Sequence, residues 1–161
     1  MSRMDSGNRL SDDRGLRMRM RGEERRISSQ HRQLEDLFAR VLGSVEAGGP
    51  RKAVSDFLLF QTALEAHMSV EEEIYFPALH GLRNDMGDEL AELVSDHELI
   101  RSLLSGIRRE LDSDEIDPAL RTLDELADRV NRHEDREEAL LARITEGPVA
   151  GFGGSVLDDG D

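Results

Sequence analysis

The sequence predicts an all-α protein: an up-down-up-down antiparallel four-helix bundle, with a flexible N-terminal leader and a flexible C-terminal tail. Apolar residues recur every three or four positions in four long stretches, and alternating apolar and polar runs typical of strands are absent. Short breaks rich in glycine, proline and aspartate separate the stretches, which favours antiparallel neighbours. The 161 residues are enough for one domain with a hydrophobic core.

The first two helices are expected after a leader of residues 1–20 and are separated by Gly48-Gly49-Pro50. Pro50 suits the first turn of a helix, where its missing N–H is not needed. The apolar stripe of the first helix is Ile27, His31, Leu34, Phe38, Val41 and Val45. The stripe of the second is Val54, Phe57, Phe60, Leu64, His67, Glu71, Ile74 and Ala78. Pro77 and Gly81 are expected to close this second helix.

The third and fourth helices are separated by Asp112-Ser113-Asp114, and Asp117-Pro118 fits an N-cap followed by a first-turn proline. The stripe of the third is Leu90, Val94, His97, Ile100, Leu104, Ile107 and Leu111. The stripe of the fourth is Leu120, Leu123, Ala127, Val130, His133, Glu137, Leu140 and Ile144. Gly147-Pro148 ends it, so the bundle is expected to span residues 21–146 and the glycine-rich tail residues 147–161.

Composition excludes several classes of site and partner. The chain has no cysteine, which excludes disulfides, thiolate metal sites and cysteine catalysis. The net charge is −14, and only the leader is rich in arginine, so we expect no binding to nucleic acid or anionic membranes. The sequence has no apolar run of about 18 residues that would predict a membrane span, and no apolar segment typical of a secretory signal. We therefore expect a cytoplasmic protein, as a monomer or a homodimer.

Each predicted helix carries one histidine in its apolar stripe: His31, His67, His97 and His133. Counted from the connectors at about 1.5 Å per residue, the four lie at the same height in the bundle to within roughly one or two Å. A glutamate follows two of them by four residues on the same helical face, namely Glu71 and Glu137. The same count predicts that the first helix begins between Met18 and Gly22.

Buried imidazoles and carboxylates are costly unless something binds them, and a pair of metal ions would do so. Two histidines and shared carboxylates per ion suit iron, manganese or zinc, with Glu71 and Glu137 as bridges. The remaining positions are free for solvent and for O2, peroxide or NO, which the ions would polarise. The alternatives are histidines satisfied within the core and a histidine–glutamate network without metal, which would be costly. A bis-histidine haem bundle ranks lower, because haem needs only two axial ligands.

Other polar residues near this layer are expected to have simpler roles. We expect Tyr75 to pack in the core, with a hydrogen bond near the site as the alternative, and His80 to lie on the surface. A solvated helix face, with one member in hydrogen-bonding reach of a ligand, is expected for Glu72, Glu73, Glu98, Glu134 and Glu138.

The motifs of the four helices together resemble the hemerythrin-like HHE cation-binding family. The matching pieces are His31-Arg-Gln-Leu, His67-x-x-x-Glu71-Glu72 with Phe76-Pro77, Asp96-His97-x-x-Ile100-Arg101, and His133-x-x-x-Glu137-Glu138, within about residues 25–146. The resemblance implies two iron ions, Fe2+ or Fe3+, with an oxo or hydroxo bridge. It implies terminal ligands at His31, His67, His97 and His133, and bridging carboxylates at Glu71 and Glu137.

One departure from the family bears on function. Oxygen-carrying hemerythrins have a further histidine one turn after the ligand of the third helix, and here that residue is Arg101. A missing fifth imidazole favours a reactive centre over a reversible O2 carrier. The resemblance therefore implies a non-haem di-iron protein that binds or detoxifies O2, peroxide or NO in oxidative or nitrosative stress. The alternative is a non-catalytic iron-binding or iron- and oxygen-sensing module.

The tail has spaced apolar residues among its glycines. Residues 149–157 end in Gly154-Ser155-Val156-Leu157, which resembles the targeting peptides that load cargo into encapsulin shells. This resemblance implies an encapsulin compartment for the protein, whereas the acidic ending Asp158-Asp159-Gly160-Asp161 departs from the basic versions of such peptides. An uncommitted tail is the alternative.

Overall fold

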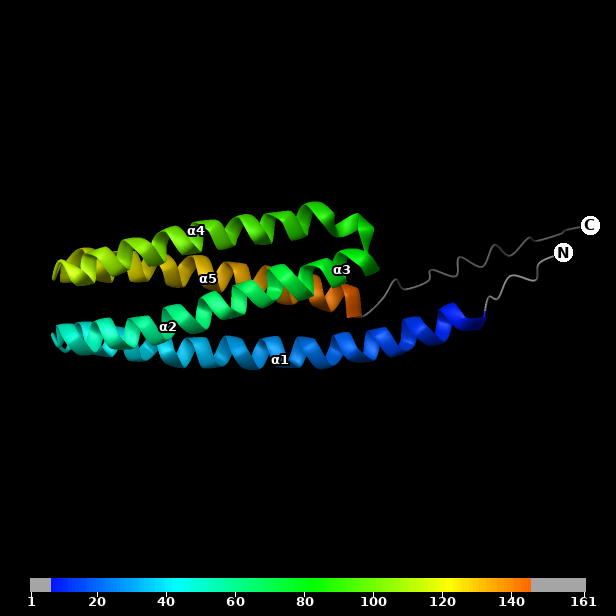
Figure 1. Ribbon diagram of the computed structural model, residues 1–161, viewed down its shortest axis with the longest axis horizontal. Coiled ribbons are helices and arrows are strands. Elements are labelled where there is room, and N and C mark those ends of the chain that lie inside the picture. The colour runs from blue at the N-terminus through cyan, green and yellow to red at the C-terminus, as the bar shows by residue number, and fades with distance from the viewer. Residues whose placement is uncertain (1–6, 146–161) are drawn as a thin grey trace, which may run out of the picture.

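Four long helices form an antiparallel bundle in the computed structural model, which describes the backbone of residues 7–145 and the side chains of residues 18, 19 and 21–144 (Figure 1). The helices are α1 (Gly7–Glu46), α2 (Pro50–Val70), α4 (Gly87–Asp112) and α5 (Ile116–Thr145). A π-helical turn, η1 (Glu71–Tyr75), and a short helix, α3 (Phe76–Leu82), continue α2, and a 3-10 turn, η2 (Asn84–Met86), leads into α4. The prediction of an all-α four-helix bundle is confirmed.

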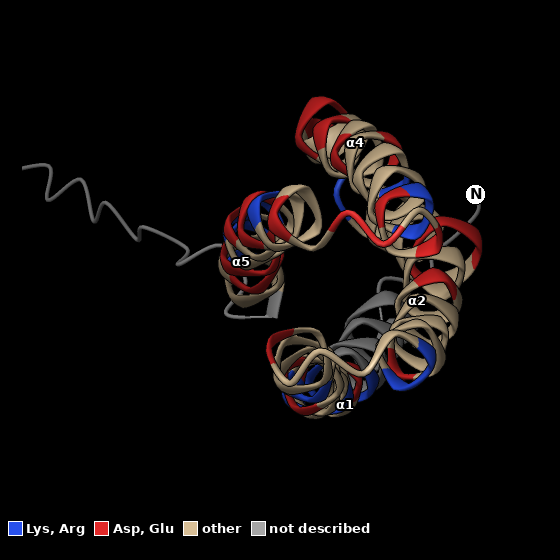
Figure 2. Ribbon diagram, turned by 90° about the vertical axis from the view of Figure 1, so that its left-hand side faces the viewer, with Lys and Arg blue, Asp and Glu red and all other residues tan. Residues whose placement is uncertain are grey.

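Seen along its axis, the bundle has α1, α2, α4 and α5 following one another around a ring (Figure 2). Short connectors at the predicted breaks allow this arrangement. Gly48 and Asp114 each adopt a positive φ, of 74° and 57°, which reverses the chain after α1 and α4. None of the helices in the described part is long and apolar enough to cross a membrane.

The first helix starts earlier than predicted. It begins at Gly7 and not between Met18 and Gly22, and α1 projects beyond the ends of the other helices (Figure 1). Residues 7–21 contain no proline and are rich in arginine, leucine and methionine, which are good helix formers. A helix that is already nucleated by packing can continue through such a segment. The predicted tail, residues 147–161, lies outside the described residues.

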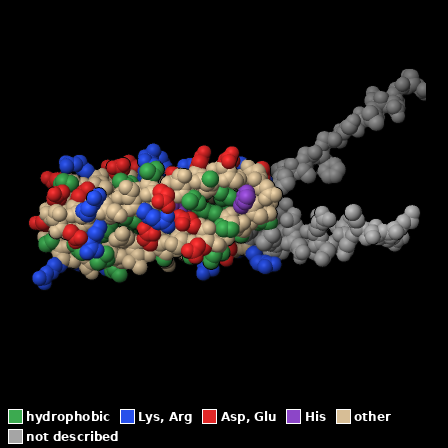
Figure 3. Space-filling model, turned by 45° about the horizontal axis from the view of Figure 1, so that its top comes forward, with side chains coloured by type: hydrophobic (Ala, Val, Ile, Leu, Met, Phe, Trp, Pro, Cys, Tyr) green, Lys and Arg blue, Asp and Glu red, His purple; other side chains and the backbone are tan. Residues whose placement is uncertain are grey.

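The core consists of two apolar clusters, one on each side of the predicted histidine layer. The cluster toward the α1–α2 connector includes Val41, Phe57, Phe60, Leu64, Ile100, Leu104, Ile107 and Leu123. The cluster toward the other end includes Ile27, Tyr75, Phe76, Leu79, Met86, Leu93, Leu140 and Ile144. The face of the molecule drawn in Figure 3 carries interspersed acidic and basic side chains. The histidine layer is therefore a polar section of an otherwise apolar core.

The π-helical turn η1 shifts the buried face of the second helical segment. The predicted stripe continues through Ile74 and Ala78, but Ile74 is 58 % exposed and Ala78 is exposed as well. Instead, the core residues after Glu71 are Tyr75, Phe76 and Leu79. The N–H of Phe76 donates to the carbonyl of Glu71, five residues back, so one extra residue is accommodated within the turn. The wider turn also precedes Pro77, which lacks an N–H and would crowd a regular helix.

Candidate metal centre

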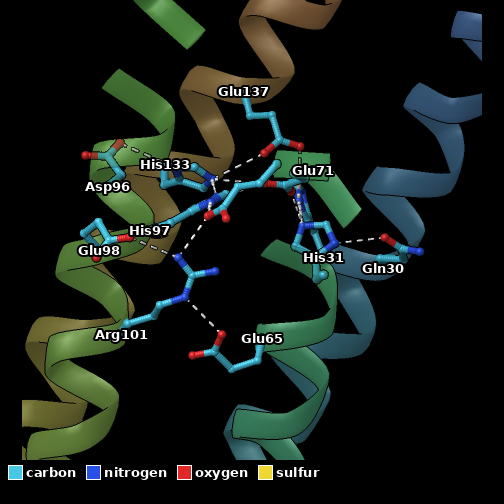
Figure 4. A network of polar contacts seen from close by, with 12 residues as sticks. Gln30, His31, Glu65, Glu71, Asp96, His97, Glu98, Arg101, His133 and Glu137 are labelled. Atoms are coloured by element: carbon cyan, nitrogen blue, oxygen red, sulfur yellow. Dashed lines mark hydrogen bonds and ion pairs between the residues drawn. The ribbon is translucent and has the colours of Figure 1, made fainter. Parts of the chain in front are cut away.

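The four histidines predicted to share a layer do so, and each comes from a different long helix (Figure 4). Their ε nitrogens meet in pairs. Nε2 of His31 on α1 lies 3.1 Å from Nε2 of His67 on α2, and Nε2 of His97 on α4 lies 3.1 Å from Nε2 of His133 on α5. All four side chains are buried, with at most 8 % exposure. The bundle thus holds two pairs of imidazoles whose metal-binding nitrogens converge.

Glu71 lies between the two histidine pairs. Its Oε1 is 2.5 Å from Nε2 of His67, and its Oε2 is 2.9 Å from Nε2 of His97 and 3.6 Å from that of His133. Both oxygens are fully buried and have no hydrogen-bond partner among the described residues. Glu71 therefore presents one oxygen to each pair.

Glu137 spans the same gap from α5. Its Oε1 is 3.8 Å from Nε2 of His31, and its Oε2 is 3.3 Å from Nε2 of His133. Its oxygens are also buried without a hydrogen-bond partner among the described residues. Together the six side chains supply two groups within reach of a cation: His31, His67, Glu71 and Glu137, and Glu71, His97 and His133.

The outward-facing δ nitrogen of each histidine is held by a side chain of a neighbouring helical segment. Nδ1 of His97 lies 2.6 Å from Glu72, and Nδ1 of His31 lies 3.2 Å from Glu138. The other two pairs are His67 with Gln30 at 2.9 Å and His133 with Asp96 at 3.4 Å. Because a carboxylate or amide oxygen only accepts, Nδ1–H donates in each pair, and in the neutral imidazole, the form that binds metal, the lone pair would then lie on Nε2.

These outer partners follow a twofold pattern in the sequence. On α1 and α4 the partner directly precedes the histidine, as Gln30-His31 and Asp96-His97, and on η1 and α5 it directly follows the glutamate, as Glu71-Glu72 and Glu137-Glu138. Each partner serves the histidine of the adjacent segment. Each of the four histidine rings is therefore oriented by its own partner from the neighbouring segment.

The site carries strongly shifted pKa values. Burial raises the pKa of Glu137 to about 8, and the charge of Glu71 adds to that effect. Burial also raises the pKa of Glu71, but the close imidazoles of His133, His67 and His97 outweigh it and hold this pKa well below its usual range. Burial lowers the pKa of His133, but the carboxylates of Glu137 and Glu71 raise the pKa to about 10. The buried groups therefore share protons that a bound cation would replace.

The donor set fits a pair of metal ions. Two buried carboxylates with orphaned oxygens are rare in a protein interior, because each unpaired oxygen keeps its desolvation cost. Here those oxygens face imidazole nitrogens, and carboxylates and neutral imidazoles are ligands that iron, manganese and zinc share.

A family model for the hemerythrin HHE cation-binding domain matches residues 23–144. The chain belongs to the hemerythrin HHE cation-binding family. The match covers the whole bundle except the first part of α1 and the end of α5. No curated protein and no solved structure matches the chain.

In this hemerythrin domain, Arg101 binds Glu72, one of the four outer partners, and does not enter the layer (Figure 4). Its Nη1 donates to Glu72 at 2.9 Å, and its Nε donates to Glu65 at 3.0 Å. The same Glu72 oxygen accepts from Nδ1 of His97. Arg101 thus holds the carboxylate that orients His97, a role that the sequence left undecided.

Two of the glutamates expected on a solvated face are tied to the site, and a third is buried. Glu138 and Glu72 bind histidine δ nitrogens, and Glu134 is buried, which raises its pKa to about 7. The expectation is therefore wrong for Glu134, because the packing of α1 against α5 covers it. The sequence pattern did not indicate a role for Gln30 or Asp96, although each directly precedes a histidine of the layer.

Tyr75 packs in the core as expected. Its side chain is 7 % exposed, and its hydroxyl donates to Glu23 at 2.6 Å, on the far side of η1 from the histidine layer in the apolar cluster. His80 is exposed, as expected.

Proposed function

We propose that this hemerythrin domain is a non-haem di-iron protein that binds or detoxifies O2, peroxide or NO. The observation that carries the proposal is the arrangement of Glu71 and Glu137, whose orphaned oxygens face histidine nitrogens of both pairs. A carboxylate placed in this way can bridge two ions. His31 and His67 would complete one position, and His97 and His133 the other.

Bound iron would supply redox and Lewis-acid chemistry toward a small ligand. The protein residues orient the ligands and exclude water. The outer partners fix the four imidazole rings with Nε2 inward, so little reorganisation accompanies binding. The two apolar clusters enclose the layer and exclude bulk water from it.

The ligand set favours a reactive centre over an O2 carrier. One group has two imidazoles and two carboxylates within reach of a cation, and the other has two imidazoles and one carboxylate, which would leave room for exogenous ligands on both ions. Arg101, where oxygen carriers have a fifth histidine, is engaged by Glu72 and Glu65. No described side chain of the layer is left to fill that position.

The test is the metal content and near-ultraviolet spectrum of protein purified in air. We expect about two irons per chain and the absorption of a coupled ferric pair. Glu71→Ala and Glu137→Ala should each reduce the content and abolish the coupled spectrum. Two metals and an unchanged spectrum in both variants would contradict the bridging assignment, and an absence of metal in the wild type would contradict the whole proposal.

The second candidate is a non-catalytic iron-binding or sensing module with the same ligands. The two candidates differ in turnover. Peroxide or NO added to the reduced protein would be consumed beyond one equivalent per site by a detoxifying protein, and not beyond it by a module that only binds.

The tail supports a separate expectation, that residues 149–157 load the protein into an encapsulin shell. Its basis is the Gly-Ser-Val-Leu sequence at 154–157, which lies outside the described residues. Deletion of residues 148–161 should abolish co-purification with the shell protein, and an unaffected co-purification would contradict the expectation.

A further inference from the structure

Glu134 is a buried carboxylate without a partner. The side chain lies on α5 directly after His133, is 8 % exposed, and makes no hydrogen bond to any residue in the described part of the chain. Its oxygens, unlike those of Glu71 and Glu137, are not fully shielded from solvent, but partial removal of a carboxylate from water without donors is still costly. A glutamine or a leucine would avoid this cost, so a structural role does not account for the residue.

The other buried carboxylate outside the metal centre is fully paired. Asp56 is 6 % exposed and accepts from Ser44, from Lys52 at 2.8 Å and from Arg40 at 3.5 Å. This protein thus surrounds a structural carboxylate with donors. Glu134 has none, which indicates that its partner is a ligand.

Glu134 faces a groove between α1 and α5 with a volume of about 560 Å³. Three further carboxylates line this groove, and they belong to Glu35, Asp135 and Glu138. Arg32 is the one guanidinium among the lining residues. Four carboxylates against one guanidinium, set between low-dielectric helices, focus a negative potential that concentrates cations.

The groove leads to the metal centre. His31 also lines it, and Glu138 at the groove accepts from Nδ1 of His31 at 3.2 Å. The opposite nitrogen of that ring, Nε2, faces the buried layer and lies 3.1 Å from Nε2 of His67. The ring of His31 therefore lies between the groove and the buried layer.

A second, apolar hollow explains why Glu134 is desolvated. It has a volume of about 280 Å³ and shares Glu134, Glu35 and Asn131 with the groove. Its other lining residues are mainly apolar, among them Leu34, Phe38, Phe60, Leu126 and Val130. Hydrated ions are disfavoured in this apolar hollow, so a cation at Glu134 would stay on the side of the acidic groove.

We propose that the groove is the entry route for divalent cations and that Glu134 is a transit ligand that takes the ion from the groove to the histidine layer. The inference rests on the proposed metal centre but not on the identity of its small-molecule substrate. The ligand class is a hydrated divalent metal such as Fe2+. Glu134 holds the ion while its remaining water is exchanged for imidazole, and it does not hold the ion at equilibrium.

The test is the rate of metal loading into the full-length apo protein, with Co2+ as the probe and its visible absorption as the signal. We expect Glu134→Gln to slow loading by about tenfold or more, as loss of electrostatic focusing would. Both proteins should reach the same final occupancy. Raised salt should slow the wild type more than the variant. The matched control is Glu125→Gln, which removes the same charge from an exposed position on α5 and should load at the wild-type rate.

The outcomes separate the two proposals. Equal loading rates for wild type and Glu134→Gln would overturn the entry route while leaving the metal centre intact. A lower final occupancy in Glu134→Gln would make Glu134 a resident ligand and would also overturn it. No binding of Co2+ by the wild type would overturn the metal centre itself. Glu35→Gln, at the exposed part of the groove, gives a second variant and should slow loading to a smaller extent.

Discussion

The side chains at the proposed metal centre have two roles: some would bind metal, and others orient the histidine rings. Six residues face inward, and four others hold the histidine rings from outside. Glu72 is held on two sides, since the same oxygen accepts from His97 at 2.6 Å and from Arg101 at 2.9 Å. Its carboxylate both fixes the ring tautomer and makes the imidazole a stronger ligand.

We expect Glu72→Ala to weaken metal binding by about 10- to 100-fold, because Nδ1 of His97 loses its acceptor. Competition with a chromophoric chelator measures this affinity. The control is Glu73→Ala, which removes an exposed carboxylate from the same turn and should leave the affinity unchanged. An equal loss of metal affinity in both variants would mean that the affinity depends on the net charge of the turn and not on the hydrogen bond to His97.

The helical segments place these side chains, and η1 is the segment that departs from regular geometry. The π turn rotates α3 relative to α2, so Phe76 enters the core at 5 % exposure and stacks on His97 with ring centroids 5.8 Å apart. In a regular helix the core would instead receive Ile74 and Ala78. The sequence signal for the shift is Pro77, which is compatible with both a helix end and a distorted turn.

Because the π turn buries Phe76 and exposes Ile74, substitutions at these two residues should differ in their effect on stability. Phe76→Ala should reduce the free energy of unfolding by about 3–5 kcal/mol, because it empties a packed site. Ile74→Ala removes an exposed side chain and should change it by less than about 0.5 kcal/mol. Urea unfolding of the two variants measures the difference. The reverse order would show that the helix runs through this segment without a π turn.

Across the whole molecule, the metal layer joins the two apolar clusters of the bundle. Without a cation, the layer contains carboxylates that repel each other and oxygens without donors. Two ions bound as proposed would remove both penalties and together would link all four long helices. Bound metal should therefore add to the stability that the two apolar clusters provide.

Removal of metal by a chelator should lower the melting temperature. At a free metal concentration about 100 times Kd, binding stabilises by about 2.7 kcal/mol per site. In a chain of this size that corresponds to roughly 5–10 °C. Calorimetry with and without chelator measures the shift. The Glu71→Ala, Glu137→Ala double variant should lose this sensitivity, and a chelator effect of equal size in that variant would contradict the coupling.

The sequence by itself determined the bundle and the inner layer. An apolar period of three to four residues sets the helices, the breaks set their antiparallel order, and depth counting brings His31, His67, His97 and His133 together. These features are local or arise from regular geometry. The family match over residues 23–144 agrees with them.

Only the tertiary structure decided which side chains surround that layer. The partners of the histidines belong to adjacent segments, so the pairing of His67 with Gln30 or of His133 with Asp96 depends on how two helices are rotated against each other. The burial of Glu134 depends in the same way on the contact between α1 and α5. Helical periodicity fixes which residues share a face of one helix, whereas side-chain partners across helices are fixed by packing, which a single sequence does not specify.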